Sequence, residues 1–111
     1  MDNTLLKRLT EESCQNDAPL MPDQEAKELT QTFHDWNYLN HSISKDFVFK
    51  NFSQVMGFIN ATAWIAQRQN HHPDVTFGYN TVKISFSTHS SGGLTRNDFI
   101  CAAKVEQLLR L

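Results

Sequence analysis

The sequence predicts an α+β domain in which a four-stranded antiparallel sheet carries three helices on one face. Two observations predict this class. Apolar residues recur at helical spacing in three stretches, and four shorter stretches alternate apolar and polar residues in two pairs joined by short turns. Strands joined by hairpins pair antiparallel, and helices then gather on one face of the sheet. The predicted order is helix, strand, strand, helix, strand, strand, helix.

Composition supports one domain and excludes several classes of protein. The chain has 111 residues, of which 40% are hydrophobic and 20% are charged, and its formal net charge is −2. This length is enough to bury a core. The charge argues against a general nucleic-acid binder, which needs a basic face for phosphates. No run of 18 apolar residues could span a membrane, and the first residues lack the apolar stretch of a secretory signal.

The two cysteines, Cys14 and Cys101, lie far apart in the sequence and show no metal-ligand spacing. Cys101 falls within an apolar helical pattern and is interpreted as a small core residue. Cys14 lies in a polar stretch, and the sequence does not indicate a disulfide. We therefore expect a reduced, cytoplasmic protein.

The first half of the chain predicts an arm, a helix and a hairpin. Residues 1–20 are polar, and although the leucines there could form one helical turn, the segment serves equally as a loose arm, so the domain is set at 21–111. A helix is expected from about Pro22, because proline fits the first helical turn. Its apolar face consists of Ala26, Leu29 and Phe33. The hairpin spans residues 36–49 with its turn at residues 40–42.

The second half predicts a long helix, two more strands and a last helix. The long helix covers about residues 52–69, with Asn51 as its N-cap and Gln54 in the third position. Its predicted apolar stripe is Phe52, Val55, Met56, Ile59, Ala63 and Ala66. Further apolar residues, including Trp64, widen this surface, which indicates burial on more than one side or an oligomer contact. The strands cover about 75–79 and 82–88, and the last helix begins near residue 96.

The adjacent pair His71-His72 and the later His89 form the clearest chemical signal in the chain. Pro73 disfavours helical backbone at His72, so the pair lies where the chain turns from helix to strand. His89 ends the last strand, where neighbouring elements can bring the three imidazoles together. Histidine exchanges protons near neutral pH, so a proton-transfer site is one interpretation. A solvated loop and a three-histidine zinc site are the alternatives, although no H-x-H or HExxH spacing occurs.

Asp98 follows Thr95 by three residues, which predicts a capping box at the start of the last helix. The same carboxylate would lie close to the loop that bears His89. There it could orient an imidazole and stabilise its protonated form, and both roles can hold at once. His34 and His41 lack such surroundings and are expected at the surface.

Four stretches occur at a specific spacing: residues 67–74 (QRQNHHPD), 79–82 (YNTV), 87–89 (STH) and 93–99 (GLTRNDF). Together they resemble the pterin-4a-carbinolamine dehydratase family, and the resemblance runs from about Trp36 to Leu109. The earlier stretch from Cys14 to Leu20, which contains Asp-Ala-Pro, resembles bacterial members. The order of predicted elements also agrees with the family fold.

The resemblance implies an enzyme, a hydro-lyase that converts 4a-hydroxytetrahydropterin to quinonoid dihydropterin and water. It implies no metal or organic cofactor, and it implies a role in recycling pterin for phenylalanine hydroxylase. The family's active-site histidines correspond to His71, His72 and His89, and its acidic residue corresponds to Asp98. We expect His71 and His89 to act as acid and base, in an order that the sequence does not assign, and His72 to orient the pterin.

Substrate contacts are expected from Gln67, Pro73, Thr88 and Trp36. The family often has a glutamate at the position of Gln67, so a hydrogen-bonding group remains there without the charge. Core packing explains Trp36 equally well. The resemblance also implies a homodimer or homotetramer, with no nucleic acid or membrane as partner. A non-catalytic dimerisation or scaffolding module of the same fold is the alternative function, because some animal relatives act as dimerisation cofactors for a homeodomain transcription factor.

Overall fold

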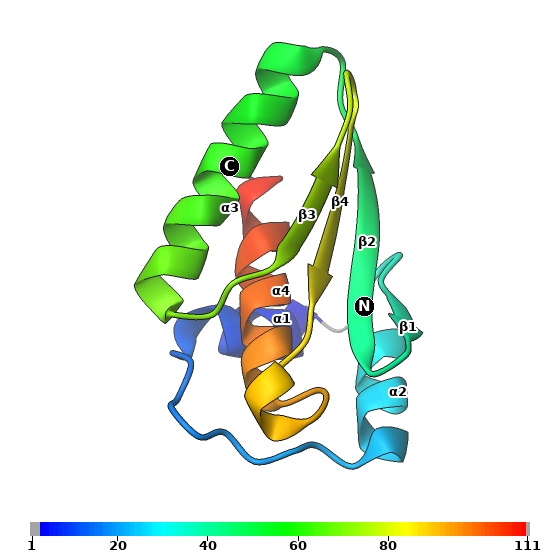
Figure 1. Cartoon of the computed structure of the whole chain (residues 1–111), viewed down its shortest axis with the longest axis vertical. Coiled ribbons are helices and arrows are strands. Elements are labelled where there is room, and N and C mark those ends of the chain that lie inside the picture. Colours follow the sequence, from blue (N-terminus) through cyan, green and yellow to red (C-terminus); the bar gives the residue numbers. More distant parts are fainter. Residues whose placement is uncertain (1–2, 111) are drawn as a thin grey trace.

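The fold is described by a computed structural model that covers residues 3–110 (Figure 1). In chain order the elements are α1 (Asn3–Glu11), α2 (Asp23–Gln31), β1 (Asn37–Leu39), β2 (Ser42–Val48), α3 (Phe52–Gln69), β3 (Asp74–Phe77), β4 (Thr81–Phe86), the short 3-10 helix η1 (His89–Ser91) and α4 (Arg96–Leu108). The strands form one sheet in the order β1-β2-β4-β3, and every neighbouring pair is antiparallel. The predicted α+β class is therefore confirmed.

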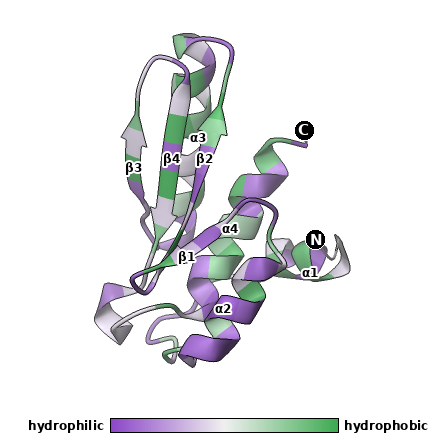
Figure 2. Cartoon of the chain, turned by 90° about the vertical axis from the view of Figure 1, so that its right-hand side faces the viewer, coloured by the Kyte–Doolittle hydropathy of each residue, from purple (hydrophilic) through white to green (hydrophobic). Residues whose placement is uncertain are grey.

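One face of the sheet is apolar and packs against α3 and α4, and Figure 2 shows α3 behind the strands. Buried and exposed residues alternate along β4, as expected for a strand with one solvated face. Across the ladder, Ile43 of β2 lies opposite Phe86 and Phe47 lies opposite Val82. Residues that face each other in an antiparallel pair share a face, so these four side chains form one apolar layer of the core.

Helix α4 lies at the centre of the molecule because other elements pack around it. It contacts α1, α3 and β4. Its residues Cys101, Ala102 and Ala103 are completely buried. Small side chains let the surrounding backbones approach closely, which explains why this part of α4 lies in the core.

The number of helices is a correction to the sequence prediction. Four α-helices are present among the described residues, and the additional one, α1, falls within the segment 1–20 that the sequence suggests as an arm. Leu6 and Leu9 of α1 are buried and belong to the same core cluster as the apolar residues of α4. The sequence of a single apolar turn does not show whether another element packs against it. In the structure, α4 packs against α1.

The buried face of α3 also differs from the predicted stripe. The buried residues are Val55, Phe58, Thr62 and Ala66. Phe52 and Trp64 remain 46% and 65% exposed. Two adjacent faces of this helix are apolar, so periodicity alone does not show which one meets the sheet. The N-cap prediction is confirmed, since the Asn51 side chain accepts from the Gln54 backbone N–H at 2.9 Å.

The ends of the predicted strands shift by a few residues. Trp36 precedes β1, Tyr79 lies in the turn after β3, and Thr88 follows β4. The turn between β1 and β2 is tighter than expected, because Asn40 and His41 both have positive φ angles, of 51° and 61°. Two successive left-handed residues are typical of a type I′ hairpin turn. No helix within residues 3–110 is long and apolar enough to cross a lipid bilayer.

Candidate active site

The end of α3 directs His71 toward α4. Asn70 ends the helix in the left-handed conformation with φ 51°, and the His71 backbone N–H donates to the Ala66 carbonyl at 3.1 Å. The imidazole lies parallel to the Phe86 ring, with 6.0 Å between centroids. Its Nε2 lies 2.6 Å from Oδ1 of Asp98. A helix cap and an apolar ring surface thus hold this histidine against a carboxylate.

Asp98 is fully buried and has defined partners for both oxygens. Its Oδ2 accepts from the Thr95 backbone N–H at 2.9 Å and from the Thr88 hydroxyl at 2.8 Å. The capping box between Thr95 and Asp98 is complete, as the sequence predicts. Because Oδ2 is occupied by these donors, Oδ1 remains for His71. One carboxylate therefore caps α4 and also orients an imidazole.

The electrostatic effect of this contact falls on His71. The hydrogen bond to Asp98 raises the pKa of His71 above its usual 6.5, and burial of the ring opposes this effect only in part. A raised pKa means that the imidazolium persists to higher pH than for a free histidine. The site therefore holds a proton-carrying group near neutral pH.

A polar pocket of about 410 Å³ opens beside His71. Thr88, Ser90 and Asn97 line it from the side of η1 and α4. A further wall is the segment 15–18, which lies between α1 and α2. Sequence reasoning missed this wall, although the Asp-Ala-Pro stretch that carries the bacterial resemblance lies within and next to it. Asp17 there has a positive φ of 55°, so the backbone makes a sharp turn at the pocket.

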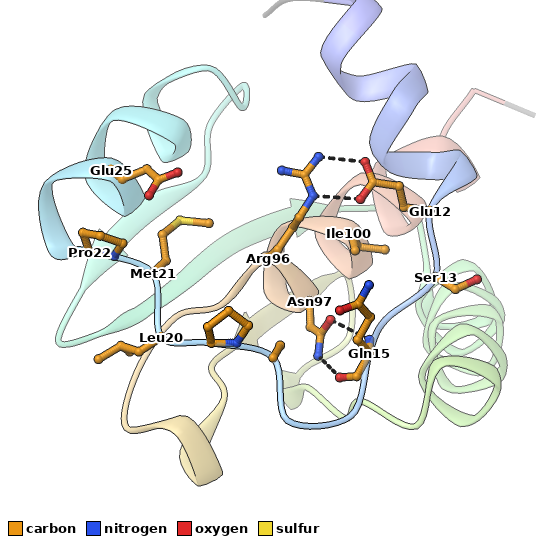
Figure 3. Close-up of a pocket in the computed structure, with 12 residues that line it drawn as sticks. Glu12, Ser13, Gln15, Leu20, Met21, Pro22, Glu25, Arg96, Asn97 and Ile100 are labelled. Carbon is orange, nitrogen blue, oxygen red and sulfur yellow. Dashed lines mark hydrogen bonds and ion pairs between the residues drawn. The ribbon is translucent and has the colours of Figure 1, made fainter.

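Side-chain hydrogen bonds fasten this wall to the helices. The Asn97 side chain pairs with the backbone of Gln15: the Gln15 N–H donates to Oδ1 at 3.0 Å and Nδ2 donates to the Gln15 carbonyl at 2.8 Å (Figure 3). The backbone N–H of Cys14 donates to Oε1 of Gln69 in α3 at 2.8 Å. Asn97 is buried, so its amide depends on Gln15 for these partners. The wall is therefore a tethered segment rather than a free arm.

A second pocket, of about 340 Å³, lies next to the same segment and is drawn in Figure 3. Leu20, Met21 and Ile100 supply apolar lining, and the guanidinium of Arg96 meets the Glu12 carboxylate in two hydrogen bonds of 2.7 Å. The hydrogen bond with Arg96 lowers the pKa of Glu12. Arg96 and Glu12 therefore satisfy each other at this pocket.

The structure brings His71, Asp98 and Thr88 together but leaves the other two predicted histidines apart from them. His72 and His89 are exposed, and in the described part of the chain neither is among the residues that line the polar pocket. His89 begins η1 and directly follows Thr88, whereas His72 follows His71 on the loop to β3. Their predicted roles remain predictions.

The predicted substrate-binding residues lie in different environments. Gln67 is exposed on the last turn of α3, and Pro73 is half-buried beyond it. Trp36 is buried in the core, where it stacks with Phe86 and its Nε1 donates to Glu106 at 2.8 Å. These surroundings are those of core packing, so a substrate contact by Trp36 remains a prediction.

His34 and His41 lie at the surface, as predicted, with side chains 75% and 69% exposed. Within residues 3–110 no group of three His, Cys, Asp or Glu side chains is arranged to hold a metal ion.

Comparisons with known proteins agree on one family. The family model described as pterin 4 alpha carbinolamine dehydratase matches residues 18–108. The chain is 43% identical over 113 residues to a candidate pterin-4-alpha-carbinolamine dehydratase of Nitrosospira multiformis, and the match covers 100% of both chains. It is 45% identical over 104 residues to one of Chromobacterium violaceum, covering 92% of this chain and 96% of the relative.

Solved structures show the same fold. A protein of Brucella melitensis described as a transcriptional coactivator/pterin dehydratase has a TM-score of 0.75 and 30% identity, covering 79% of this chain and 96% of that one. A pterin dehydratase-like protein identified as a RuBisCO assembly factor in the alpha-carboxysome has a TM-score of 0.55 and 24% identity, covering 66% and 84%. At that identity the second likeness concerns the fold alone.

Proposed function

The chain belongs to the pterin-4a-carbinolamine dehydratase family, and from that premise we propose that it removes water from 4a-hydroxytetrahydropterin to give quinonoid dihydropterin. In this reaction the C4a–O bond breaks and the hydroxyl leaves as water after it receives a proton. The proton on N5 is removed, and its electron pair forms the N5=C4a double bond. The reaction therefore needs one proton donor and one proton acceptor, and no electron transfer.

In this proposal His71 is the general acid. The observation that carries this assignment is the 2.6 Å contact between His71 Nε2 and Asp98 Oδ1 beside a polar pocket. Nε2 donates to the carboxylate, so Nδ1 is the ring nitrogen that can exchange a proton with the substrate. The raised pKa of His71 favours the protonated form that an acid needs. Asp98 does not react, and it positions the ring and stabilises its charge.

His89 then serves as the base that accepts the N5 proton, and His72 orients the pterin. The position of His89 directly after Thr88, which lines the pocket, supports this role. His89 is exposed, so its ring is accessible to a bound substrate. The contacts to the pterin come from Gln67, Pro73 and Thr88. Trp36 supports the site from the core, because its ring stacks on Phe86 and the Phe86 ring in turn lies parallel to His71.

The wall at residues 15–18 extends the proposed substrate site. It carries the Asp17 carboxylate, and it lines the same pocket as His71. A pterin carries amino and N–H donors on its pyrimidine ring, and carboxylate and carbonyl oxygens accept such donors. We therefore assign this segment to pterin binding rather than to the proton transfers.

The test is a dehydration assay with a 4a-carbinolamine substrate, followed by ultraviolet absorbance. His71→Ala and His89→Ala should each lower kcat by roughly 10²–10⁴-fold, limited below by the spontaneous reaction, because each removes one acid–base group. His34→Ala is the matched control, since His34 is a surface histidine paired with its neighbour Asp35 and should keep the wild-type rate. Wild-type rates in both His71→Ala and His89→Ala would contradict the acid and base assignment.

A non-catalytic dimerisation or scaffolding role is the second candidate. The observation that favours it is the exposed aromatic surface of α3, where Trp64 is 65% exposed. Wild-type protein without dehydratase activity, but with a defined oligomer, would favour this alternative. A homo-oligomeric state, a cytoplasmic location and a link to phenylalanine hydroxylase also belong to the proposal, and the latter two rest on the family resemblance alone.

A further inference from the structure

The two cysteines meet in the folded chain although 87 positions separate them. Cys14 lies in the segment after α1, and Cys101 lies on the second turn of α4. Their sulfur atoms are 3.5 Å apart. Cys101 is completely buried, whereas Cys14 is only partly buried. One thiol of the pair is therefore within reach of a small solute and the other is protected.

The surroundings of Cys14 keep this pair together. Its backbone N–H is bound to Gln69, and the next residue, Gln15, is clamped by the side chain of Asn97. The sulfur itself also contacts the Asn97 carbonyl at 3.6 Å. A disulfide has an S–S distance of about 2.05 Å, so the sulfurs need to approach by about 1.5 Å. The loop position of Cys14 can absorb such a shift, while Cys101 stays fixed in its helix.

The two thiols differ in reactivity in a complementary way. The hydrogen bond from Cys101 lowers the pKa of Cys14, and the nearby His71 acts in the same direction. The same hydrogen bond, together with burial, raises the pKa of Cys101. The thiolate is the nucleophilic form, so Cys14 is the sulfur that is oxidised first. Cys101 is the sulfur that then attacks the oxidised Cys14.

We propose that Cys14 and Cys101 are a modification site at which hydrogen peroxide forms a reversible disulfide. The Cys14 thiolate attacks one peroxide oxygen, the O–O bond breaks, and Cys14 becomes a sulfenic acid while hydroxide leaves. The Cys101 sulfur then attacks the Cys14 sulfur, the S–O bond breaks, and the departing hydroxide takes the Cys101 proton as water. Overall, two thiols lose two electrons and one peroxide is reduced to two waters. A dithiol reductant reverses the reaction.

The disulfide joins the residue just before the wall segment of the polar pocket to α4. It closes a long chain loop, so it restricts the unfolded state and stabilises the folded one. This consequence does not depend on the proposed dehydratase reaction, and its measurement uses no enzyme assay.

The test treats the full-length wild-type protein with hydrogen peroxide, denatures it and adds a maleimide before intact mass is measured. We expect a monomer that is lighter by two hydrogen atoms and takes up no maleimide, and two maleimide groups after dithiothreitol. The Tm of the oxidised protein should rise by roughly 5 °C or more, and dithiothreitol should reverse the rise. Two alkylated thiols after peroxide, a stable sulfinic acid on Cys14, or a disulfide between two chains would overturn the proposal.

Single substitutions separate the pair from other effects of peroxide. Cys14→Ser should keep one alkylatable thiol after peroxide, because buried Cys101 does not react alone, and its Tm should not rise. In Cys101→Ala, peroxide should oxidise Cys14 but form no disulfide within the chain, because no second thiol is present to attack the oxidised sulfur. A Tm rise of equal size in Cys14→Ser would show that the stabilisation does not come from this disulfide.

Discussion

The carboxylate of Asp98 links helix capping to proton chemistry within one residue. Its Oδ2 is held by Thr88 and Thr95, so the orientation of Oδ1 toward His71 does not depend on His71 itself. The imidazole of His71 therefore meets a carboxylate oxygen whose position is already fixed.

At this scale we predict the effect of Asp98→Asn on the pH dependence of turnover. The substitution keeps an oxygen for the cap but removes the charge that raises the pKa of His71. Since the proposed acid must be protonated, kcat falls as pH rises through this pKa, and in Asp98→Asn that fall should move to lower pH. The maximum kcat should drop by roughly 10²-fold. Steady-state rates measured across pH check both effects.

The same pKa shift has a consequence for stability. A raised pKa in the folded state means that the His71–Asp98 contact contributes its full stability below pH 6.5 and loses it as pH rises through the folded pKa. The free energy of unfolding of wild type relative to Asp98→Asn should therefore decrease with rising pH in this range. Urea unfolding at several pH values measures this difference in the free energy of unfolding. The role of Asp98 would be contradicted if the difference did not change with pH and the fall of kcat at high pH did not move in Asp98→Asn.

Thr62 gives a second prediction at the residue scale. Its hydroxyl is buried in α3, and among the described residues it is the buried side-chain polar atom that lacks a hydrogen-bond partner. Thr62→Val removes the unsatisfied group with nearly the same shape, so it should stabilise the fold by about 1 kcal/mol without changing kcat. Thr30→Val is the matched control, because the buried Thr30 hydroxyl donates to the Ala26 carbonyl at 2.7 Å. The control should destabilise by about 1 kcal/mol, and equal effects in both variants would contradict the explanation.

At the scale of elements, the connection between α1 and α2 is part of the pocket. Residues 15–18 line it, and Asn97 on α4 binds the backbone of this connection with both ends of its amide. The amide satisfies the groups of an irregular segment that has no ladder or helix to bond with. Two consecutive residues of α4 thus serve the pocket. Asn97 holds the wall segment, and Asp98 positions the proposed acid His71.

We predict that Asn97→Ala raises KM for the pterin by roughly tenfold and changes kcat much less. The reason is that the wall then loses two hydrogen bonds and contributes less to binding in ground and transition states alike. Arg96→Ala is the control: it breaks the partly exposed pair with Glu12 and leaves the polar pocket lining unchanged, so KM should stay near wild type. An unchanged KM in Asn97→Ala, or a loss confined to kcat, would contradict the binding role of the wall.

At the scale of the whole molecule, one group of exposed apolar residues lies on α3 and on the edge strand β3. Phe52 and Phe77 are 46% and 50% exposed and their ring centroids lie 6.3 Å apart, while Trp64 is exposed further along α3. The edge strand also offers unpaired backbone groups along one side. Apolar surface of this extent next to an open edge is typical of a surface that pairs with another chain.

The corresponding prediction is that light scattering finds a mass of two or four times the 12.8 kDa of one chain. Trp64→Glu should lower this mass or weaken the assembly on dilution, because it places a charge on the exposed face of α3. Leu39→Glu is the control, since Leu39 is 66% exposed on β1 at the opposite edge of the sheet. A monomeric wild-type protein would contradict the proposed assembly.

Local patterns explain how much of this architecture the sequence predicts. Alternation in β4, the cap at Asn51 and the box between Thr95 and Asp98 each depend on residues within one element, so they are readable without a structure. The wrong predictions concern which of two adjacent apolar faces of a helix packs against the rest of the molecule. The exposed Phe52 has the same spacing as a core residue, and nothing local shows that another face of α3 meets the sheet.

The sequence by itself determined the α+β class, the two hairpins and the presence of His71 and Asp98 as candidate proton-transfer groups. Only the tertiary structure decided that these two residues meet, that residues 15–18 form the pocket wall and that Cys14 meets Cys101. The physical reason is range. Backbone geometry and hydrophobic periodicity act over a few residues, whereas these contacts join positions 27 to 87 apart and depend on how α1, α3 and α4 pack together.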